Sequence, residues 1–174
     1  MISGRDLKVW DPLVRLLHWG LVASIAITWI AGEAWLRTHE IAGYMALGIV
    51  AVRVVWGLVG SAHARFADFV AGPAVVWRYA VDVLRARESR HLGHNPLGGW
   101  MVLALLVSVV VTGFSGWLYT TDQFWGLAWV DLLHRTSAWA MVGLIVLHLA
   151  GVVFTSLRHR ENLVVSMLSG RKRR

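Results

Sequence analysis

The sequence predicts an all-α integral membrane protein, a four-helix bundle with both termini on the cytoplasmic side. Three observations lead to this fold class. Hydrophobic residues make up 57% of the 174 residues and charged residues only 16%, whereas charged residues make up roughly 25% of soluble domains. Four apolar stretches have about the 20 residues that a helix needs to cross a bilayer. Basic residues gather in alternate connections, as the positive-inside rule describes.

The four predicted spans begin at residues typical of helix starts. They cover residues 13–31, 41–59, 97–119 and 136–157. Asp11-Pro12 and Asn95-Pro96 each combine a capping oxygen with a proline at the first helical position. Thr38 is the predicted cap of the second span and Asp131 that of the fourth. The first apolar stretch begins late and lacks a clear cleavage site, so we expect the N-terminus to be retained.

The charged flanks predict the orientation. Two connections, after the first and the third span, hold only Arg37 and Arg135 as cations. The other flanking cations precede or open the first span, fill the second connection or follow the fourth span: Arg5, Lys8, Arg15, Arg65, Arg78, Arg85, Arg87, Arg90, Arg158, Arg160, Arg171, Lys172, Arg173 and Arg174. The net charge of +7 therefore reflects the orientation of the helices in the membrane and does not indicate nucleic-acid binding. We expect the protein to lie in the bacterial inner membrane, in contact with lipid.

The long second connection carries an amphipathic pattern over residues 74–88. Valines and a tyrosine alternate there with arginines and an aspartate at helical spacing. This pattern predicts a helix that lies on the inner membrane surface. We expect residues 1–174 to form a single membrane domain.

Histidine is the residue left to carry metal or redox chemistry. The chain has no cysteine, which excludes disulfides, iron–sulfur clusters, thiolate zinc sites and covalently attached haem. Ionisable side chains at membrane depth are functional candidates. The sequence places five of them there: His18, Arg53 and His148 inside spans, and His39 and His134 at span entrances.

Depth sorts the four histidines into two pairs. His134 and His148 are fourteen residues apart, a rise of roughly 21 Å with the rings about 40° apart on one helix face. The first span starts inside, so His18 lies at the depth of His148; the second starts outside, so His39 lies at the depth of His134. Facing imidazoles in an apolar bundle predict axial ligation of two non-covalent haems b. We call His39–His134 the outer pair and His18–His148 the inner pair.

Two alternatives stay open for these polar groups. A histidine in a membrane span can also serve only to hydrogen-bond a neighbouring helix. For His39 or His134 considered alone, this structural role explains the residue as well as haem ligation does. Arg53 shares a face with His39 and is predicted to neutralise a haem propionate. Arg15 and Arg135 are predicted to do the same or to snorkel to the interface. Small residues that would admit a flat ring or a neighbouring backbone are Gly43, Gly113 and Gly116.

These motifs together resemble the bacterial cytochrome b561 family of four-helix di-haem b cytochromes. That superfamily includes the b-type cytochrome subunits of nickel–iron hydrogenases. The matching pieces are WDPLVRLLHW at residues 10–19, His39-x3-Gly43-x9-Arg53, GHNPLGG at residues 93–99, Thr112-Gly113 with Gly116-Trp117, and His134-x13-His148. The resemblance covers nearly the whole chain.

The resemblance implies a membrane electron carrier. Histidines that match His18, His39, His134 and His148 ligate two haems b in this family. Its members pass electrons between the quinone pool and a partner, often a c-type cytochrome, a hydrogenase or another periplasmic redox subunit. A bound quinone is a further expectation. The GHNPLGG motif is similar to that of the family branch that depends on a redox partner. Some hydrogenase subunits have a fifth span, which is missing here, and this difference disfavours a hydrogenase partner.

Two other functions compete with this one. A related branch oxidises superoxide and reduces quinone, which needs a cationic funnel at the outer haem, and only Arg37 and Arg135 are available for it. A histidine-lined metal or proton transporter would carry carboxylates inside its spans. None lies within the four predicted spans, so the sequence favours electron transfer.

Overall fold

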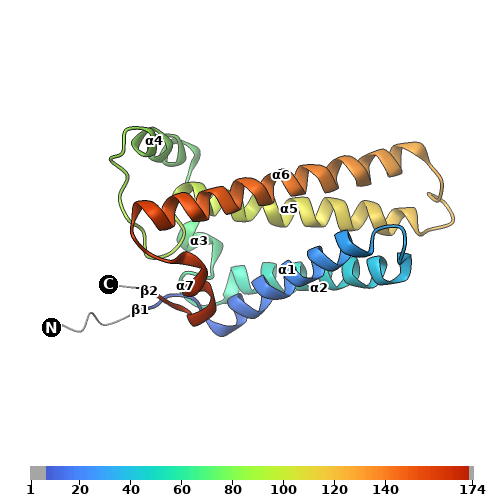
Figure 1. Cartoon of the computed structure of the whole chain (residues 1–174), viewed down its shortest axis with the longest axis horizontal. Helices are drawn as coiled ribbons and strands as arrows, with labels where there is room; N and C mark the ends of the chain where they lie inside the picture. Colours follow the sequence, from blue (N-terminus) through green and yellow to red (C-terminus); the bar gives the residue numbers. More distant parts are fainter. Residues whose placement is uncertain (1–6, 173–174) are drawn as a thin grey trace. The chain divides into compact units, whose positions relative to one another are not determined.

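The computed structural model describes residues 7–172 and is helical, as the sequence predicts (Figure 1). Four long helices are apolar enough to cross a membrane, with mean hydropathies of 1.6 to 2.2. They are α1 (Pro12–Ala31), α2 (Leu36–Val59), α5 (Pro96–Tyr119) and α6 (Ala128–Arg158). The remaining elements are short: α3 (Phe66–Phe69), α4 (Pro73–Leu84), α7 (Leu163–Ser169), β1 (Leu7–Lys8) and β2 (Arg171–Lys172). The all-α membrane fold is therefore confirmed, while the cytoplasmic placement of the termini stays a prediction. Three of the basic residues on which that placement rests, Arg5, Arg173 and Arg174, lie outside the described residues.

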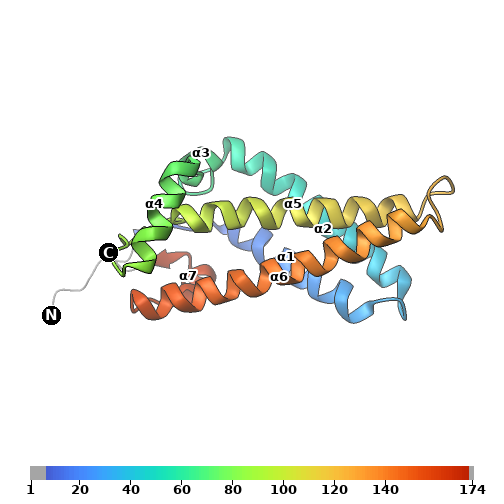
Figure 2. The same ribbon diagram turned by 90° about the horizontal axis from the view of Figure 1, so that it is seen from above.

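The chain forms two compact units, and each long helix contributes to both. Of the described residues, the first unit comprises 7–15, 55–103 and 146–172, and the second comprises 16–54 and 104–145. In the second unit, α5 and α6 lie side by side in both views (Figures 1 and 2), and Thr112 Oγ1 donates to Ser137 Oγ at 3.0 Å. The single membrane domain stays a prediction.

Two of the four predicted helix caps are confirmed and two are wrong. The Asp11 carboxylate accepts from the Val14 amide at 2.8 Å, and the Asn95 side chain accepts from the Gly98 amide at 2.7 Å. The other two helices begin earlier than predicted, at Leu36 and Ala128. Thr38 and Asp131 therefore lie inside their helices. The apolar pattern ends at the charged residues, but a helix continues through them because its backbone hydrogen bonds do not depend on apolar side chains.

The first unit fastens the two ends of the described chain to each other. Strand β1 pairs antiparallel with β2, with Leu7 opposite Lys172. The apolar cluster beneath consists of Val9, Trp10, Val14 and Ala64. The guanidinium of Arg15 donates to the Met167 and Leu168 carbonyls at the end of α7. It thereby satisfies carbonyls that a helix end leaves without partners.

The predicted amphipathic segment 74–88 is helical over Pro73–Leu84, as α4. It ends before residue 88 because the chain turns at Ala86, where φ is 55°. Glu88, beyond this turn, accepts from Arg158 Nε at 2.8 Å and its side chain is only 2% exposed. This ion pair ties the second connection to the end of α6. The location of α4 on the membrane surface stays a prediction.

Gly99, from the GHNPLGG motif, allows α5 to approach the backbone of α3. A Cβ at this position would lie 2.5 Å from the Phe69 carbonyl oxygen and 3.1 Å from Phe69 Cδ2. We expect Gly99→Ala to destabilise the protein by about 1–3 kcal/mol, the usual effect of overpacking, and to lower the melting temperature in detergent by several degrees. Gly72→Ala is the matched control, since Gly72 has a φ of −64° and a Cβ there would meet nothing within 4 Å. Equal melting temperatures for the two variants would contradict the prediction.

Candidate functional site

The structure brings the two histidines of the outer pair together within the second unit. His39 lies in the first turn of α2 and His134 in the second turn of α6. Their ring centroids are 6.1 Å apart, and the ring planes are inclined by 69°. Both side chains are half-buried. Residues separated by 95 positions in the sequence thus face one another, as their predicted depths require.

Each ring of the outer pair is held by a backbone carbonyl of a neighbouring helix. His39 Nδ1 lies 2.9 Å from the Thr28 carbonyl oxygen on α1, and His134 Nδ1 lies 3.0 Å from the Thr112 carbonyl oxygen on α5. A carbonyl only accepts, so Nδ1 carries the hydrogen and Nε2 keeps its lone pair. Metal-ligating histidines typically donate their second ring N–H in this way. Both rings are therefore prepared to bind a metal through Nε2.

The spacing of the outer pair fits an iron between two axial imidazoles. With metal–nitrogen bonds of about 2.0 Å and ring centres about 1 Å behind each nitrogen, the ring centres lie roughly 6 Å apart. Among residues 7–172, no group of three or more histidine, aspartate or glutamate side chains forms a metal site. Two imidazoles are a sufficient donor set for haem, because the porphyrin supplies the other nitrogens.

The three predicted glycines lie in different surroundings. A Cβ on Gly116 would lie 3.0 Å from His134 Cε1, so this glycine lets the ring lie against α5. Gly43 is one turn after His39, and a Cβ there would meet nothing within 4 Å. Gly113 instead allows close packing with Leu47, whose Cδ2 would lie 2.7 Å from an added Cβ. Gly116 thus accommodates the His134 ring, whereas the space around Gly43 is open.

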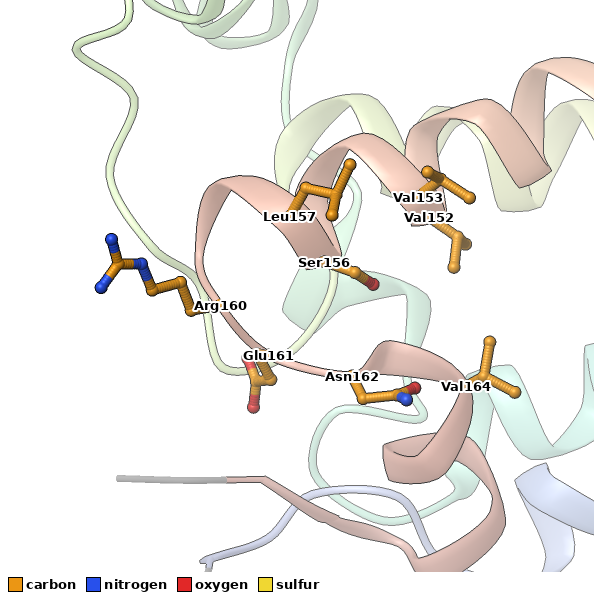
Figure 3. Close-up of a pocket in the computed structure, with 8 residues that line it drawn as sticks. All are labelled: Val152, Val153, Ser156, Leu157, Arg160, Glu161, Asn162 and Val164. Atoms are coloured by element: carbon orange, nitrogen blue, oxygen red, sulfur yellow. The ribbon is translucent and has the colours of Figure 1, made fainter.

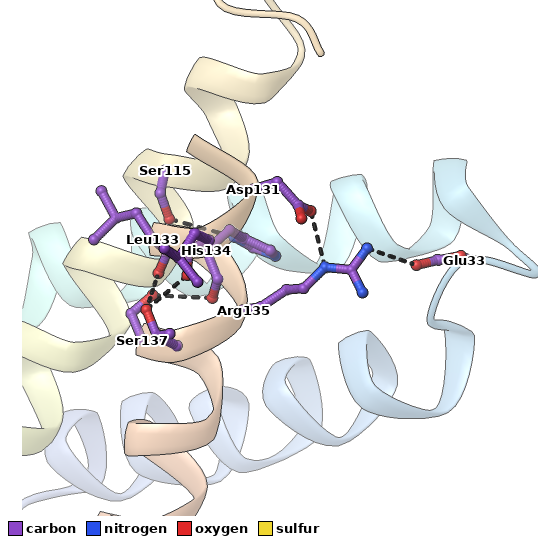
Figure 4. A network of polar contacts seen from close by, with 9 residues as sticks. Glu33, Ser115, Asp131, Leu133, His134, Arg135 and Ser137 are labelled. Carbon is purple, nitrogen blue, oxygen red and sulfur yellow. Dashed lines mark hydrogen bonds and ion pairs between the residues drawn. The ribbon is translucent and has the colours of Figure 1, made fainter. Parts of the chain in front are cut away.

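Arg135 is neutralised by carboxylates (Figure 4). Its Nε lies 2.9 Å from Asp131 and its Nη2 lies 3.6 Å from Glu33, with the side chain 64% exposed. Arg135 and Arg37 are the two cations of the connections predicted to be outside, and the charge of Arg135 is balanced by carboxylates. A cationic funnel that would guide superoxide to the outer pair therefore has little support.

The other predicted site residues are distributed over both units. His18 and the buried Arg53, which is 6% exposed, belong to the second unit. His148 and Arg15 belong to the first unit, where Arg15 binds the α7 carbonyls. The pairing of His18 with His148 and the contact of Arg53 with a propionate stay predictions. His94, from the GHNPLGG motif, packs between the rings of Trp10 and Phe69, with centroids at 4.8 and 4.6 Å.

An apolar groove lies on the first unit between α6 and α7 (Figure 3). Its volume is about 350 Å³. The residues that line it are Val152, Val153, Ser156, Leu157, Arg160, Glu161, Asn162 and Val164. Val152 follows His148 by four residues, or one helical turn. The sequence pattern did not indicate this groove, because α7 is too short and too uniformly apolar to be recognised.

Comparison with known proteins places most of the chain in one family. Residues 9–170 match the family model of prokaryotic cytochrome b561. A probable Ni/Fe-hydrogenase B-type cytochrome subunit of Cupriavidus necator is 26% identical over 97% of this chain and 88% of its own length. Its counterpart in Bradyrhizobium diazoefficiens is 24% identical over 94% and 85% of the two chains. The corresponding subunit of Rhizobium leguminosarum is 23% identical over 98% of this chain and 90% of its own length.

The alignment with the Cupriavidus necator protein also shows a difference in length. It extends over 223 positions, more than the 174 residues of this chain, so the relative has residues inserted within the matched region. No solved structure matches the chain. The family match over residues 9–170, together with four long apolar helices, establishes the class of protein. The chain belongs to the prokaryotic cytochrome b561 family and is a multi-pass b-type cytochrome that transfers electrons in a bacterial membrane with haem b.

Proposed function

We propose that this protein carries electrons across the bacterial inner membrane through two bis-histidine haems b, between the quinone pool and a redox partner. The observation that carries the proposal is the outer pair, with ring centroids 6.1 Å apart and both Nδ1 atoms on carbonyls. Haem b, when bound, supplies a one-electron couple.

The residues of the chain have separate tasks in this mechanism. His39 and His134 hold the outer haem, and the Thr28 and Thr112 carbonyls fix the ring orientations. His18 and His148 hold the inner haem by the depth argument. The apolar helices keep water away from both sites, which helps to set their potentials. Arg53, buried in α2, balances a propionate charge that would otherwise be costly in an apolar environment.

The groove between α6 and α7 supports quinone exchange close to the inner haem. Its walls are mostly apolar, and it begins one turn after His148. Apolar clefts with a few polar groups are typical sites for such ligands. Asn162 and Arg160 in its lining supply polar groups for a quinone head group.

Filling this groove is expected to impair quinone reaction without loss of haem. Val164→Trp places an indole in the groove and should raise the KM for a soluble quinol at least several-fold. Val165→Trp is the matched control, since Val164 and Val165 are 49% and 53% exposed on the same helix and only Val164 lines the groove. The measurement is haem reduction by quinol in stopped flow. Equal KM values for both variants would place the quinone elsewhere.

The partner is proposed to be a redox subunit on the outer side. The named relatives are hydrogenase cytochrome subunits, which supports a redox enzyme as the partner that exchanges electrons with the outer haem. A c-type cytochrome is the other candidate, from the resemblance to the family. Superoxide oxidation receives no comparable support, because Arg135 is paired with Asp131 and Glu33.

A reduced-minus-oxidised absorption spectrum with haem quantified per polypeptide tests the proposal. We expect two low-spin b-type haems per chain. One haem would mean that one histidine pair is misassigned. A colourless protein would overturn the redox function and favour a histidine-lined transporter.

A further inference from the structure

Ser115 on α5 is fully buried beside His134, with 0% exposure (Figure 4). Its hydroxyl donates to the Thr112 carbonyl at 2.9 Å. The same oxygen lies 3.3 Å from His134 Nδ1. Because the hydroxyl hydrogen is already donated, the oxygen accepts from the ring N–H. The N–H of His134 is thus shared between the Thr112 carbonyl at 3.0 Å and the Ser115 hydroxyl.

The two rings of the outer pair therefore differ in their surroundings. In the described part of the chain, His39 Nδ1 has the Thr28 carbonyl as its acceptor, whereas His134 Nδ1 has two acceptors. The helices around His134 are also joined by Thr112 Oγ1, which donates to Ser137 Oγ at 3.0 Å. Ser137 in turn donates to the His134 carbonyl at 3.1 Å. Ser115 is thus part of a polar network that fixes the orientation of one ring.

An acceptor on the second ring nitrogen changes the ligand as well as its orientation. It increases the electron density on the ligating nitrogen and so favours the more highly charged iron. Hydrogen bonding to axial ligands is one of the means by which a protein sets a haem potential. A second acceptor on His134 should therefore lower the potential of the haem that this histidine holds.

We propose that Ser115 is a positioning residue that orients the His134 imidazole and lowers the midpoint potential of the outer haem. This inference rests on the proposed function, in which His134 is an axial ligand. Gly116, the next residue, provides the room for the ring to reach both acceptors. Ser115 and Gly116 thus act on the same imidazole from adjacent positions.

The test is a redox titration of the purified holoprotein, combined with electron paramagnetic resonance of the ferric haems. In Ser115→Ala we expect an upward shift of one midpoint potential and a change in one ferric signal, with the other haem unaffected. Ser108→Ala is the matched control, because Ser108 makes the same type of bond to Leu105 at 2.8 Å on the same helix. In a His39→Ala background, Ser115→Ala should leave the remaining haem unchanged.

The outcomes separate this inference from the proposed function. Two haems in the wild type and unmoved midpoints in Ser115→Ala would overturn the role of Ser115 alone. Loss of one haem in Ser115→Ala with recovery in Ser115→Thr, which retains the hydroxyl, would support positioning; loss in both variants would overturn it. A wild-type protein without haem would overturn both inferences.

Discussion

Replacing His39 by alanine is expected to remove one of two haems and to leave the other intact. Axial ligation by two imidazoles needs both rings, and the partner ring of His134 lies only 6.1 Å away. The remaining haem should titrate as a single one-electron step, and electron transfer across the membrane should fall to background. The measurement is haem per polypeptide together with a redox titration of the purified variant.

Double variants test the pairing more strictly than single ones. His39→Ala with His134→Ala empties one site only, so one haem should remain. His39→Ala with His148→Ala affects both proposed sites, so no haem should remain. Retention of a haem in the second combination, or loss of both in the first, would contradict the pairing by depth.

A loop histidine provides the matched control for these variants. His91 Nδ1 lies 3.0 Å from the Ser89 carbonyl, the same type of contact that the outer pair makes. Its ring packs against Tyr79 at 5.3 Å and not against another histidine. His91→Ala should therefore retain both haems. Haem loss in this variant would show that a histidine-to-alanine change damages the protein nonspecifically.

The sequence predicted the elements of the outer pair but not the contacts that orient it. The depth of His39 and His134 follows from span order and charge, which are properties of the sequence alone. The acceptors on their rings are backbone carbonyls of Thr28 and Thr112, and every residue has such a carbonyl. Ser115 gave no signal either, because a serine in an apolar span most often bonds its own helix. Only the packing of α5 against α6 identifies its second contact.

The role of Arg15 illustrates the same limit at longer range. Its guanidinium was predicted to meet a propionate or the interface, because it lies one turn before His18. In the structure it binds carbonyls of α7, more than 150 positions away in the sequence. A seven-residue apolar helix with no charged face has no periodic pattern that predicts it. Contacts made by such an element depend on tertiary packing.

The motifs that open α1 and α5 serve the architecture of the first unit. GHNPLGG contributes the Asn95 cap, the close approach of Gly99 and the packing of His94. WDPLVRLLHW contributes Asp11, which joins three parts of the chain. The Asp11 carboxylate accepts from the Val14 amide at 2.8 Å, from Trp56 Nε1 at 3.1 Å and from the Ser61 hydroxyl. It thus links the start of α1 to the end of α2.

Asp11→Ala is accordingly expected to cause a large loss of stability. Loss of a helix cap costs about 1 kcal/mol, and loss of the carboxylate leaves the Trp56 and Ser61 donors without their acceptor. Together these effects should destabilise the protein by roughly 2–4 kcal/mol. Thermal unfolding in detergent measures the change. Asp68→Ala is the control: Asp68 forms an exposed pair with Arg65 at 3.0 Å, and such a pair contributes about 0–1 kcal/mol.

The stabilisation by Asp11 should also depend on pH. Partial burial raises the pKa of the carboxyl, but hydrogen bonds from Ser61, Val14 and Trp56 outweigh burial and hold the pKa below its ordinary value. The unfolded chain then takes up a proton first, near pH 4, so the contribution is complete above about pH 4 and is lost as the pH falls through the folded pKa. Glu88, whose pKa is lowered by its bond from Arg158, adds to the same acid dependence. The difference between wild type and Asp11→Asn therefore isolates Asp11. The melting temperature of the wild type should fall more steeply than that of the variant as the pH is lowered below about 4, and parallel curves would show that the Asp11 charge contributes nothing to stability.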